Sequence, residues 1–312
     1  MTTAKPALDE LFDQRQSYPD IDARERLDRL IGLDDQKSRL SKILGLLVHP
    51  AGLEAWANKH HPGAATLLDT VLRRPPLVIL AGDVGSGKTE LAETIGDAVA
   101  RQEKINVTLF PLSLATRGQG QVGEMTQLLT SAIDHALAEA KKLKVIGKKS
   151  NGGIILLVDE ADALAQSRES AQMHHEDRAG VNAFIRGIDR LAQAKVPAAV
   201  IMCTNRLSAL DPAVRRRAAD ILTFSRPDAA LRRHVLQQRL EPLGLSKAQL
   251  SGLVSATGAQ NGHDVGFTFS DLTQRLIPTI VLDAYPDRAV DGERALQIAQ
   301  GMVPTPAFRD QA

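Results

Sequence analysis

The feature that most constrains this sequence is a glycine-rich stretch that directly follows a short apolar run. The run is Leu77–Ala81, and residues 82–89 then read Gly-Asp-Val-Gly-Ser-Gly-Lys-Thr, which fits the pattern G-x-x-x-x-G-K-[ST]. Glycines let backbone N–H groups curl around phosphate oxygens, and the N-terminus of a following helix adds partial positive charge. The sequence therefore predicts a strand, a phosphate-binding loop and a helix, rather than a glycine-rich turn without catalytic meaning.

Residue types in this loop suit the parts of a nucleoside triphosphate. Lys88 can reach the β and γ phosphates as a mobile point charge, and the hydroxyl of Thr89 can ligate Mg²⁺. We therefore expect ATP and Mg²⁺ as cofactors. The residues expected to bind the nucleotide here are Gly82, Val84, Gly85, Ser86, Gly87, Lys88, Thr89 and Glu90.

A second apolar run, Ile154–Val158, ends in the acidic pair Asp159 and Glu160. In open α/β sheets ligands bind at the carboxyl edge, where such a pair would lie. Asp159 is suited to hold Mg²⁺, and Glu160 can polarise an attacking water as general base. A kinase-like protein would need no water activator, so the pair favours hydrolysis over phosphate transfer; the alternative is a solvated acidic turn.

A third apolar run, Ala198–Cys203, is followed by Thr204 and Asn205. The amide of Asn205 could orient the same water or contact the γ-phosphate. Asparagine at a strand end is by itself common turn chemistry. Its place after the two preceding motifs favours the catalytic interpretation.

Three consecutive arginines, Arg215, Arg216 and Arg217, stand directly before the next strand-like stretch. One interpretation is an exposed basic helix end, where arginine complements the helix dipole. The other, which we favour, is an arginine finger that reaches the nucleotide of a neighbouring subunit, with Arg216 and Arg217 ahead of Arg215. Such fingers contribute about 10³–10⁵ in rate. A finger supplied by a neighbour implies a ring of subunits.

Short apolar runs separated by helical patterns indicate a parallel sheet covered by helices on both faces. The runs are Leu77–Ala81, Val107–Leu112, Ile154–Val158, Ala198–Cys203 and Ile221–Phe224, and the helical patterns between them are Lys88–Arg101, Met125–Leu143 and Ala179–Ala194. Beyond Pro227 only helical periodicity remains, over Ala229–Leu240, Lys247–Ala256, Phe269–Ala284 and Asp291–Gly301. The prediction is an α/β fold: a polar N-terminal arm (1–27), a five-stranded parallel nucleotide-binding domain (28–226), and a small all-helical lid (227–312), with ATP held between sheet domain and lid.

The bulk composition limits the partners. A net charge of +1 over 312 residues gives no general attraction to nucleic acid or anionic lipid. No apolar run approaches the length of a membrane span, and the N-terminus lacks the apolar core of a signal peptide. The single cysteine, Cys203, excludes an internal disulfide and a cysteine-built zinc site. We expect a cytoplasmic protein without membrane or nucleic-acid partners.

The order of these motifs resembles that of the AAA+ ATPases, in which Walker A, Walker B, sensor 1, arginine finger and helical lid follow one another. The resemblance covers roughly residues 28–302. It implies that Ile31 and Gly32 border the adenine through their backbone. It also implies a homo-hexameric ring that threads or tugs a protein substrate through its centre.

A narrower resemblance points to the pachytene checkpoint ATPases. It is carried by Asp177–Leu191, the strand before Asn205, Arg217–Ile221, and Gly266–Ser270 with Arg275 and Pro278 downstream. Those enzymes remodel HORMA-domain proteins, and bacterial relatives accompany a cGAS-like nucleotidyltransferase in anti-phage operons. The resemblance implies that this chain disassembles a HORMA-based activating complex and so holds defence signalling off.

Three departures from that family pattern bear on the mechanism. The eukaryotic members carry an N-terminal adaptor-binding domain, whereas residues 1–27 leave room only for an arm, so substrate should be engaged directly or through the arm. The pore loop usually has an aromatic where Gln121 stands, so grip would come from Arg117, Gln121, Val122 or a second loop near residues 173–175. The sensor 2 arginine of the lid is replaced by Leu272, and Arg275 is a weak substitute.

Three other functions fit parts of the pattern. One is a general AAA+ remodeller or activator of another protein client. A second is a DNA-associated loader or transposition helper, which DNA-stimulated ATP turnover with a steep salt dependence would reveal. A third is a nucleotide switch that binds ATP without turnover, which Glu160 argues against.

Overall fold

The computed structural model describes residues 11–114, 124–144, 150–164, 175–259 and 263–307. Its internal packing divides the chain into two units. The α/β unit comprises residues 1–29, 34–81 and 89–223, and the helical unit comprises residues 30–33, 82–88 and 224–312. In the sequence, the pattern changes from strands and helices to helices alone at Arg226–Pro227. In the structure, the helical unit begins at Phe224 and also includes the phosphate-binding loop.

The sheet has six strands in the order β1-β3-β4-β5-β2-β6. They are β1 (Gln16–Tyr18), β2 (Leu77–Gly82), β3 (Asn106–Ser113), β4 (Gly152–Asp159), β5 (Ala198–Thr204) and β6 (Ala218–Phe224). Strands β3, β4, β5 and β2 are parallel along the sheet, and β1 pairs antiparallel with the edge of β3. The α/β prediction is therefore confirmed, and β1 is added to the five expected strands.

The added strand comes from the segment expected to be an arm. Its three residues, Gln-Ser-Tyr, contain no apolar run, so no strand signal marks them. Tyr18 is buried at 2% exposure, and its hydroxyl donates to the backbone carbonyl of Glu93. Helix α2 (Ile21–Asp28) follows, and its N-cap Asp20 accepts a hydrogen bond from the N–H of Ala23. Residues 11–28 thus belong structurally to the α/β unit.

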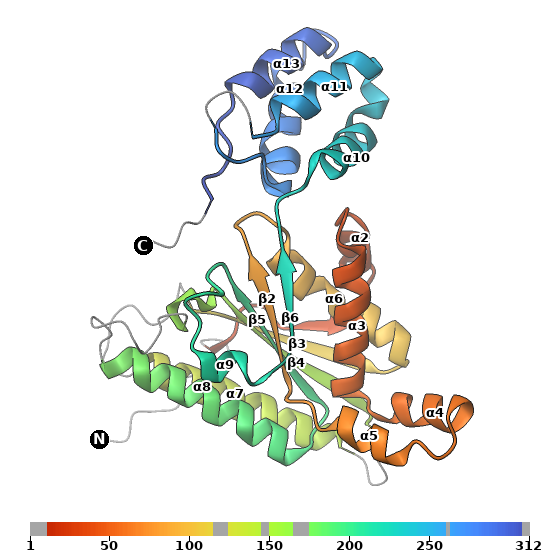
Figure 1. The fold of residues 1–312 in the computed structure, drawn as a ribbon, viewed down its shortest axis with the longest axis vertical. Coiled ribbons are helices and arrows are strands. Elements are labelled where there is room, and N and C mark those ends of the chain that lie inside the picture. The colour runs from red at the N-terminus through yellow and green to blue at the C-terminus, as the bar shows by residue number, and fades with distance from the viewer. Residues whose placement is uncertain (1–10, 115–123, 145–149, 165–174, 260–262, 308–312) are drawn as a thin grey trace. The chain divides into compact units, whose positions relative to one another are not determined.

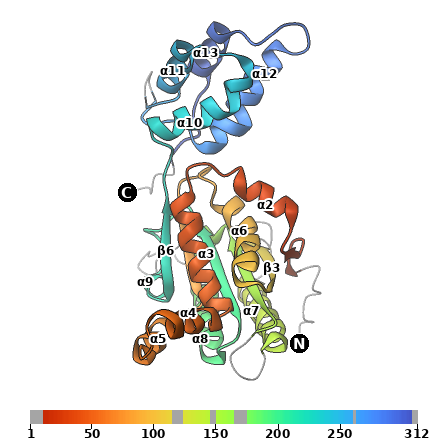
Figure 2. The same ribbon diagram turned by 90° about the vertical axis from the view of Figure 1, so that its right-hand side faces the viewer.

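Helices cover both faces of the sheet (Figures 1 and 2). Helices α7 (Glu124–Leu143) and α8 (His175–Ala194) lie on one face, and α3 (Asp34–Val48) and α6 (Lys88–Glu103) lie on the other. The remaining elements of this unit are α4 (Ala51–His60), α5 (Ala65–Leu72), the 3₁₀ helix η1 (Ala161–Leu164) and α9 (Pro212–Arg215). Within the described ranges, no helix has the length and apolar character to cross a membrane.

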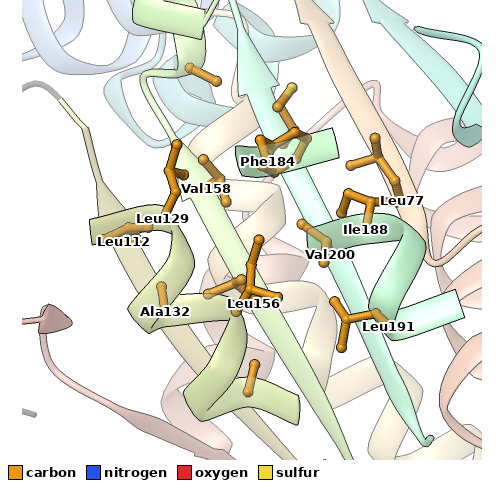
Figure 3. Close-up of a cluster of buried hydrophobic side chains, with 14 of the residues drawn as sticks. Leu77, Leu112, Leu129, Ala132, Leu156, Val158, Phe184, Ile188, Leu191 and Val200 are labelled. Carbon is orange, nitrogen blue, oxygen red and sulfur yellow. The ribbon is translucent and has the colours of Figure 1, made fainter. Parts of the chain in front are cut away.

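The core explains why the strands are apolar throughout. Alternate residues of β4, such as Leu156, face the cluster under α7 and α8, where they meet Leu129 and Phe184 (Figure 3). The residues between them, such as Ile155 and Leu157, are equally buried on the opposite face. Because both faces are covered, neither set of alternating positions can be polar.

The helical unit contains α10 (Ala229–Leu240), the 3₁₀ helix η2 (Glu241–Leu243), α11 (Lys247–Ala256), the π-helix η3 (Asp271–Leu276), α12 (Ile277–Ala284) and α13 (Gly292–Gly301). Residues such as Val235, Leu253, Phe267 and Leu276 form its core. The sequence predicts one helix over Phe269–Ala284, but the first part is π-helical. Pro278 offers no N–H to continue an α-helical ladder through this point, and the N–H of Ile277 instead reaches the carbonyl of Leu272.

Candidate active site

The phosphate-binding loop adopts backbone conformations that suit glycine. Gly82, Gly85 and Gly87 have φ angles of 156°, 69° and 89°. The space around them is also filled, since a Cβ on Gly82 would lie 2.0 Å from the carbonyl oxygen of Phe224, and one on Gly85 would lie 2.7 Å from Oγ1 of Thr268. The backbone is therefore bare at Gly82 and Gly85, where no side chain would fit and where phosphate oxygens can approach the N–H groups.

Lys88 is buried at 7% exposure, with its ammonium held by oxygens of the loop itself. Nζ donates to the carbonyls of Gly82 at 2.9 Å and Asp83 at 2.7 Å. The hydroxyl of Ser86 also donates to the Asp83 carbonyl, at 2.7 Å. These contacts hold a positive charge inside the loop, where phosphate oxygens could replace the carbonyls as partners.

Thr89 and Asp159, the two residues expected to bind the metal, lie side by side in the α/β unit. Oγ1 of Thr89 is 3.4 Å from Oδ1 of Asp159. One hydroxyl and one carboxylate oxygen at this separation form a hard oxygen donor set, which suits Mg²⁺ when nucleotide phosphates and water supply the remaining ligands. The residues present therefore fit the expected cofactor.

Glu160 stands at the end of β4 with a strained backbone. Its φ angle is 52°, in the left-handed region that non-glycine residues rarely adopt. The residue is exposed, and its N–H donates to Oδ1 of Asp159 at 2.8 Å. Strain of this kind persists where surrounding structure enforces it and clusters at active sites. The turn places the two adjacent carboxylates in different environments. This is compatible with separate roles, in which Asp159 binds the metal and Glu160 acts as the general base.

Asn205 is held by Asp162, an acidic residue that lies outside the sequence motifs. Asp162 lies in η1, three residues after Asp159, and accepts hydrogen bonds from Oγ1 of Thr204 and from the backbone N–H of Asn205. Its other oxygen accepts the side-chain N–H of Asn205. The signal available in the sequence was a further acid just after the Asp-Glu pair. The structure therefore joins the loop after β4 to the end of β5.

The three arginines differ in their surroundings. Arg217 makes a bidentate pair with Asp189 of α8, at 2.7 and 2.9 Å, and donates to the carbonyl of Ala213. The hydrogen bond to Asp189 raises the pKa of Arg217. Arg215 and Arg216 are exposed, and among the described residues neither side chain has a hydrogen bond or ion pair. Arg216 is thus better placed than Arg217 to act on a partner.

Ile31, Gly32 and Glu90 were also predicted to contact the nucleotide. Ile31 packs on the core of the helical unit, and Gly32, at a φ of 74°, faces Leu231, whose Cδ2 would be 2.6 Å from an added Cβ. The carboxylate of Glu90 is bound by Arg26 at 2.8 and 3.0 Å, which leaves its backbone N–H as the group for a nucleotide.

The predicted residues of the lid and of the exposed loop have varied surroundings. Leu272, which the family resemblance aligns with the sensor 2 arginine, is fully buried. Arg275 pairs with Asp271 and donates to the carbonyl of Val303. Val84 is exposed in the phosphate-binding loop. The proposed pore-loop residues, Arg117, Gln121, Val122 and 173–174, lie outside the described residues, as does the side chain of His175.

Comparisons with known proteins agree with this arrangement. The family model "ATPase family associated with various cellular activities (AAA)" matches residues 78–226. CD-NTase-associated protein 6 of Escherichia coli (strain MS 115-1) is 65% identical over 307 residues, which covers 98% of this chain and 99% of that protein. A chain of the E. coli MS115-1 HORMA:CdnC:Trip13 complex has a TM-score of 0.90 at 64% identity, covering 98% of this chain and 100% of that one. The structure of Rhizobiales Trip13 has a TM-score of 0.73 at 57% identity, covering 95% and 100%.

Proposed function

This chain belongs to the CD-NTase-associated protein 6 family of AAA ATPases, and we propose that it uses ATP hydrolysis to open or disassemble a HORMA-domain signalling protein. Such an activity would restrain the nucleotidyltransferase that the HORMA protein activates, and would act in the cytoplasm. The observation that carries the proposal is the likeness over almost the whole chain to a chain of the E. coli MS115-1 HORMA:CdnC:Trip13 complex, at 64% identity. As an AAA ATPase, the chain binds nucleotide.

We assign the steps of ATP hydrolysis to residues with the geometry described above. The cradle of residues 82–88 binds the phosphates, and Lys88 exchanges the loop carbonyls for β and γ oxygens. Mg²⁺, when bound by Thr89 and Asp159, neutralises charge that develops on the phosphate oxygens. Glu160 accepts a proton from the attacking water, and the amide oxygen of Asn205 orients that water because its nitrogen is engaged by Asp162.

The chain is proposed to work as a homo-hexameric ring. Arg216 carries an exposed guanidinium with no partner in the described part of its own chain. A neighbouring subunit's γ-phosphate would supply that partner, and the finger would make each active site depend on the next subunit. Hydrolysis could then change the contacts between subunits and do work on a bound protein.

The test combines this chain with a purified HORMA-domain protein that carries a bound fluorescent peptide. Glu160→Gln should bind ATP and retain the HORMA protein without releasing the peptide, whereas the native protein should release it in an ATP-dependent manner. Lys88→Ala should do neither. Size-exclusion chromatography and a fluorescent peptide measure both steps. A native protein that hydrolyses ATP but never binds or changes the HORMA protein would overturn the proposal.

The same variants test the other candidates. A different protein retained on Glu160→Gln with ATP would point to a remodeller of another client. Turnover stimulated by DNA, with a steep salt dependence, would point to a loader.

A further inference from the structure

The phosphate-binding loop contains a carboxylate, an unexpected group beside a polyphosphate. Asp83 occupies the second position of the loop, and its Oδ1 accepts the N–H of Val84 at 2.8 Å. Its Oδ2 accepts a hydrogen bond from Nε of Arg226 at 2.5 Å. The side chains are only 18% and 12% exposed, so water screens this pair weakly.

Arg226 also binds a third segment of the helical unit. It is the second residue after β6, and its Nη1 donates to the carbonyl of Gly266 at 2.7 Å. A backbone hydrogen bond also joins the phosphate-binding loop to the segment before η3: the N–H of Ser270 donates to the carbonyl of Gly85 at 3.1 Å. One guanidinium therefore joins the phosphate-binding loop, the segment after β6 and the segment that leads into η3.

Stability alone is a weak explanation for this pair. A buried ion pair loses hydration on both sides, and its replacement by apolar residues is often neutral or stabilising. Nη2 of Arg226 is also buried without a hydrogen-bond partner among the described residues, which adds a further cost. The pair therefore calls for an explanation in terms of what lies next to it, namely the loop that binds phosphate.

We propose that Arg226 is a positioning residue for nucleotide binding: it neutralises and orients Asp83, so that the carboxylate can shape the phosphate-binding loop without repelling the phosphates. This inference rests on the proposed ATP binding by residues 82–88. Asp83 holds the turn at Val84, and Arg226 compensates its charge and anchors the loop to Gly266. Occupancy of the loop would in this way reach the segment at Gly266 through one side chain.

An electrostatic role predicts effects of opposite sign at the two positions. Arg226→Gln removes the compensating charge and should weaken ATP binding about tenfold, because a carboxylate then acts on the phosphates in a weakly screened site. ATP should be affected more than ADP, since it carries more negative charge. Asp83→Asn keeps an oxygen for the Val84 N–H, leaves the guanidinium in place and removes a negative charge beside the phosphates, so ATP should bind about threefold tighter. The double variant should return to within about threefold of the native affinity.

The measurement is the Kd of fluorescent ATP and ADP analogues with Mg²⁺ for the full chain, together with thermal unfolding without nucleotide. Arg233→Gln is the matched control, because it removes an exposed arginine of the same unit whose guanidinium, among the described residues, donates to the hydroxyl of Ser251. If Arg226→Gln fails to fold, Arg226→Lys, which keeps the charge, replaces it and should bind ATP within about threefold of native.

The outcomes separate the two proposals. Opposite effects of the single variants and recovery in the double variant support the inference. Equal weakening by both singles, a double variant weaker than either, or an effect of Arg226→Gln no larger than that of Arg233→Gln overturns it. Failure of the native protein to bind ATP, while folded, would instead overturn the proposed ATP-binding site itself.

Discussion

The side-chain amide of Asn205 donates to the carboxylate of Asp162, with Nδ2 and Oδ2 2.9 Å apart. A carboxylate accepts hydrogen bonds and cannot donate them, so the nitrogen of the amide must face Asp162 and the oxygen must face away. The amide oxygen can therefore accept a proton from a water molecule. The pair fixes both the position and the orientation of the residue assigned to that water.

We predict that Asp162→Ala slows ATP turnover while ATP binding survives. Loss of the carboxylate frees Asn205 to rotate, and misplacement of a catalytic group by about 1 Å can cost about 10²-fold in rate. Steady-state turnover and ATP affinity measure the two effects separately. Asn205→Ala should have a similar effect, and the double variant should be no slower than the slower single variant. Additive losses would mean that Asp162 acts independently of Asn205.

Arg216→Ala should abolish most turnover without destabilising the fold, because its side chain is exposed and makes no hydrogen bond or ion pair in the described part of the chain. The expected loss is about 10³-fold. Arg217→Ala should instead lower stability by about 1 kcal/mol, through loss of a partly exposed pair with Asp189. Turnover and urea unfolding of the two variants provide the comparison.

A mixing experiment tests whether the finger acts between subunits. Arg216→Ala and Lys88→Ala are each expected to be inactive alone. In mixed rings some sites would combine a native loop from one subunit with a native Arg216 from the next, so activity should partly return. If mixtures remain as inactive as the separate variants, Arg216 does not act in trans.

Much of the fold was predictable because its strands are buried on both faces. Each of the five predicted runs lies within an observed strand, for example Ile154–Val158 within β4. Continuous burial leaves a continuous apolar signal. Strand β1 was not predicted because its three residues, Gln16–Tyr18, contain no apolar run. They are held at the sheet edge by backbone pairing to β3 and by burial of the Tyr18 side chain, and neither interaction leaves a pattern in the local sequence.

The candidate site divides in the same way. The glycines, Lys88 and the Asp159–Glu160 pair were found because each motif is contiguous in sequence. Other contacts of the site join residues from distant segments. Asp162 and Asn205 are separated by 43 positions, and Asp83 and Arg226 by 143. No spacing rule links such residues, so only the folded arrangement shows that Arg217 is engaged and Arg216 is not.

Asp271 should stabilise the helical unit in a pH-dependent manner. It is fully buried; burial alone would raise the pKa of its carboxyl, but hydrogen bonds from Thr268, Thr305 and Arg275 outweigh burial and lower the pKa below the ordinary 3.8. A lowered folded-state pKa means that the stabilisation is present above that ordinary value and is lost as the pH falls through the folded value. Asp271→Asn should therefore cost about 2 kcal/mol near neutral pH and less in acid.

Urea unfolding at pH 7 and near pH 3 measures this difference. Asp287→Asn is the control, because Asp287 is exposed in the same unit. It should change stability by less than about 0.5 kcal/mol at either pH. A cost for Asp271→Asn that stays constant down to pH 3 would contradict the assigned role of the charged carboxylate.

Two glycines with the same backbone conformation allow the cradle to be tested apart from backbone strain. Gly85 and Gly244 have φ angles of 69° and 71°, so alanine at either position should cost about 1 kcal/mol in conformational strain. A Cβ on Gly244 would meet no atom within 4 Å, whereas one on Gly85 would lie 2.7 Å from Oγ1 of Thr268 and 3.0 Å from Cβ of Ser270. Gly85→Ala must therefore displace the phosphate-binding loop or the segment packed on it. We expect ATP binding to weaken at least about tenfold for Gly85→Ala and to remain native for Gly244→Ala, with a larger loss of thermal stability for Gly85→Ala because of the added clash. Equal ATP affinities for the two variants would mean that the close packing of Gly85 plays no part in nucleotide binding.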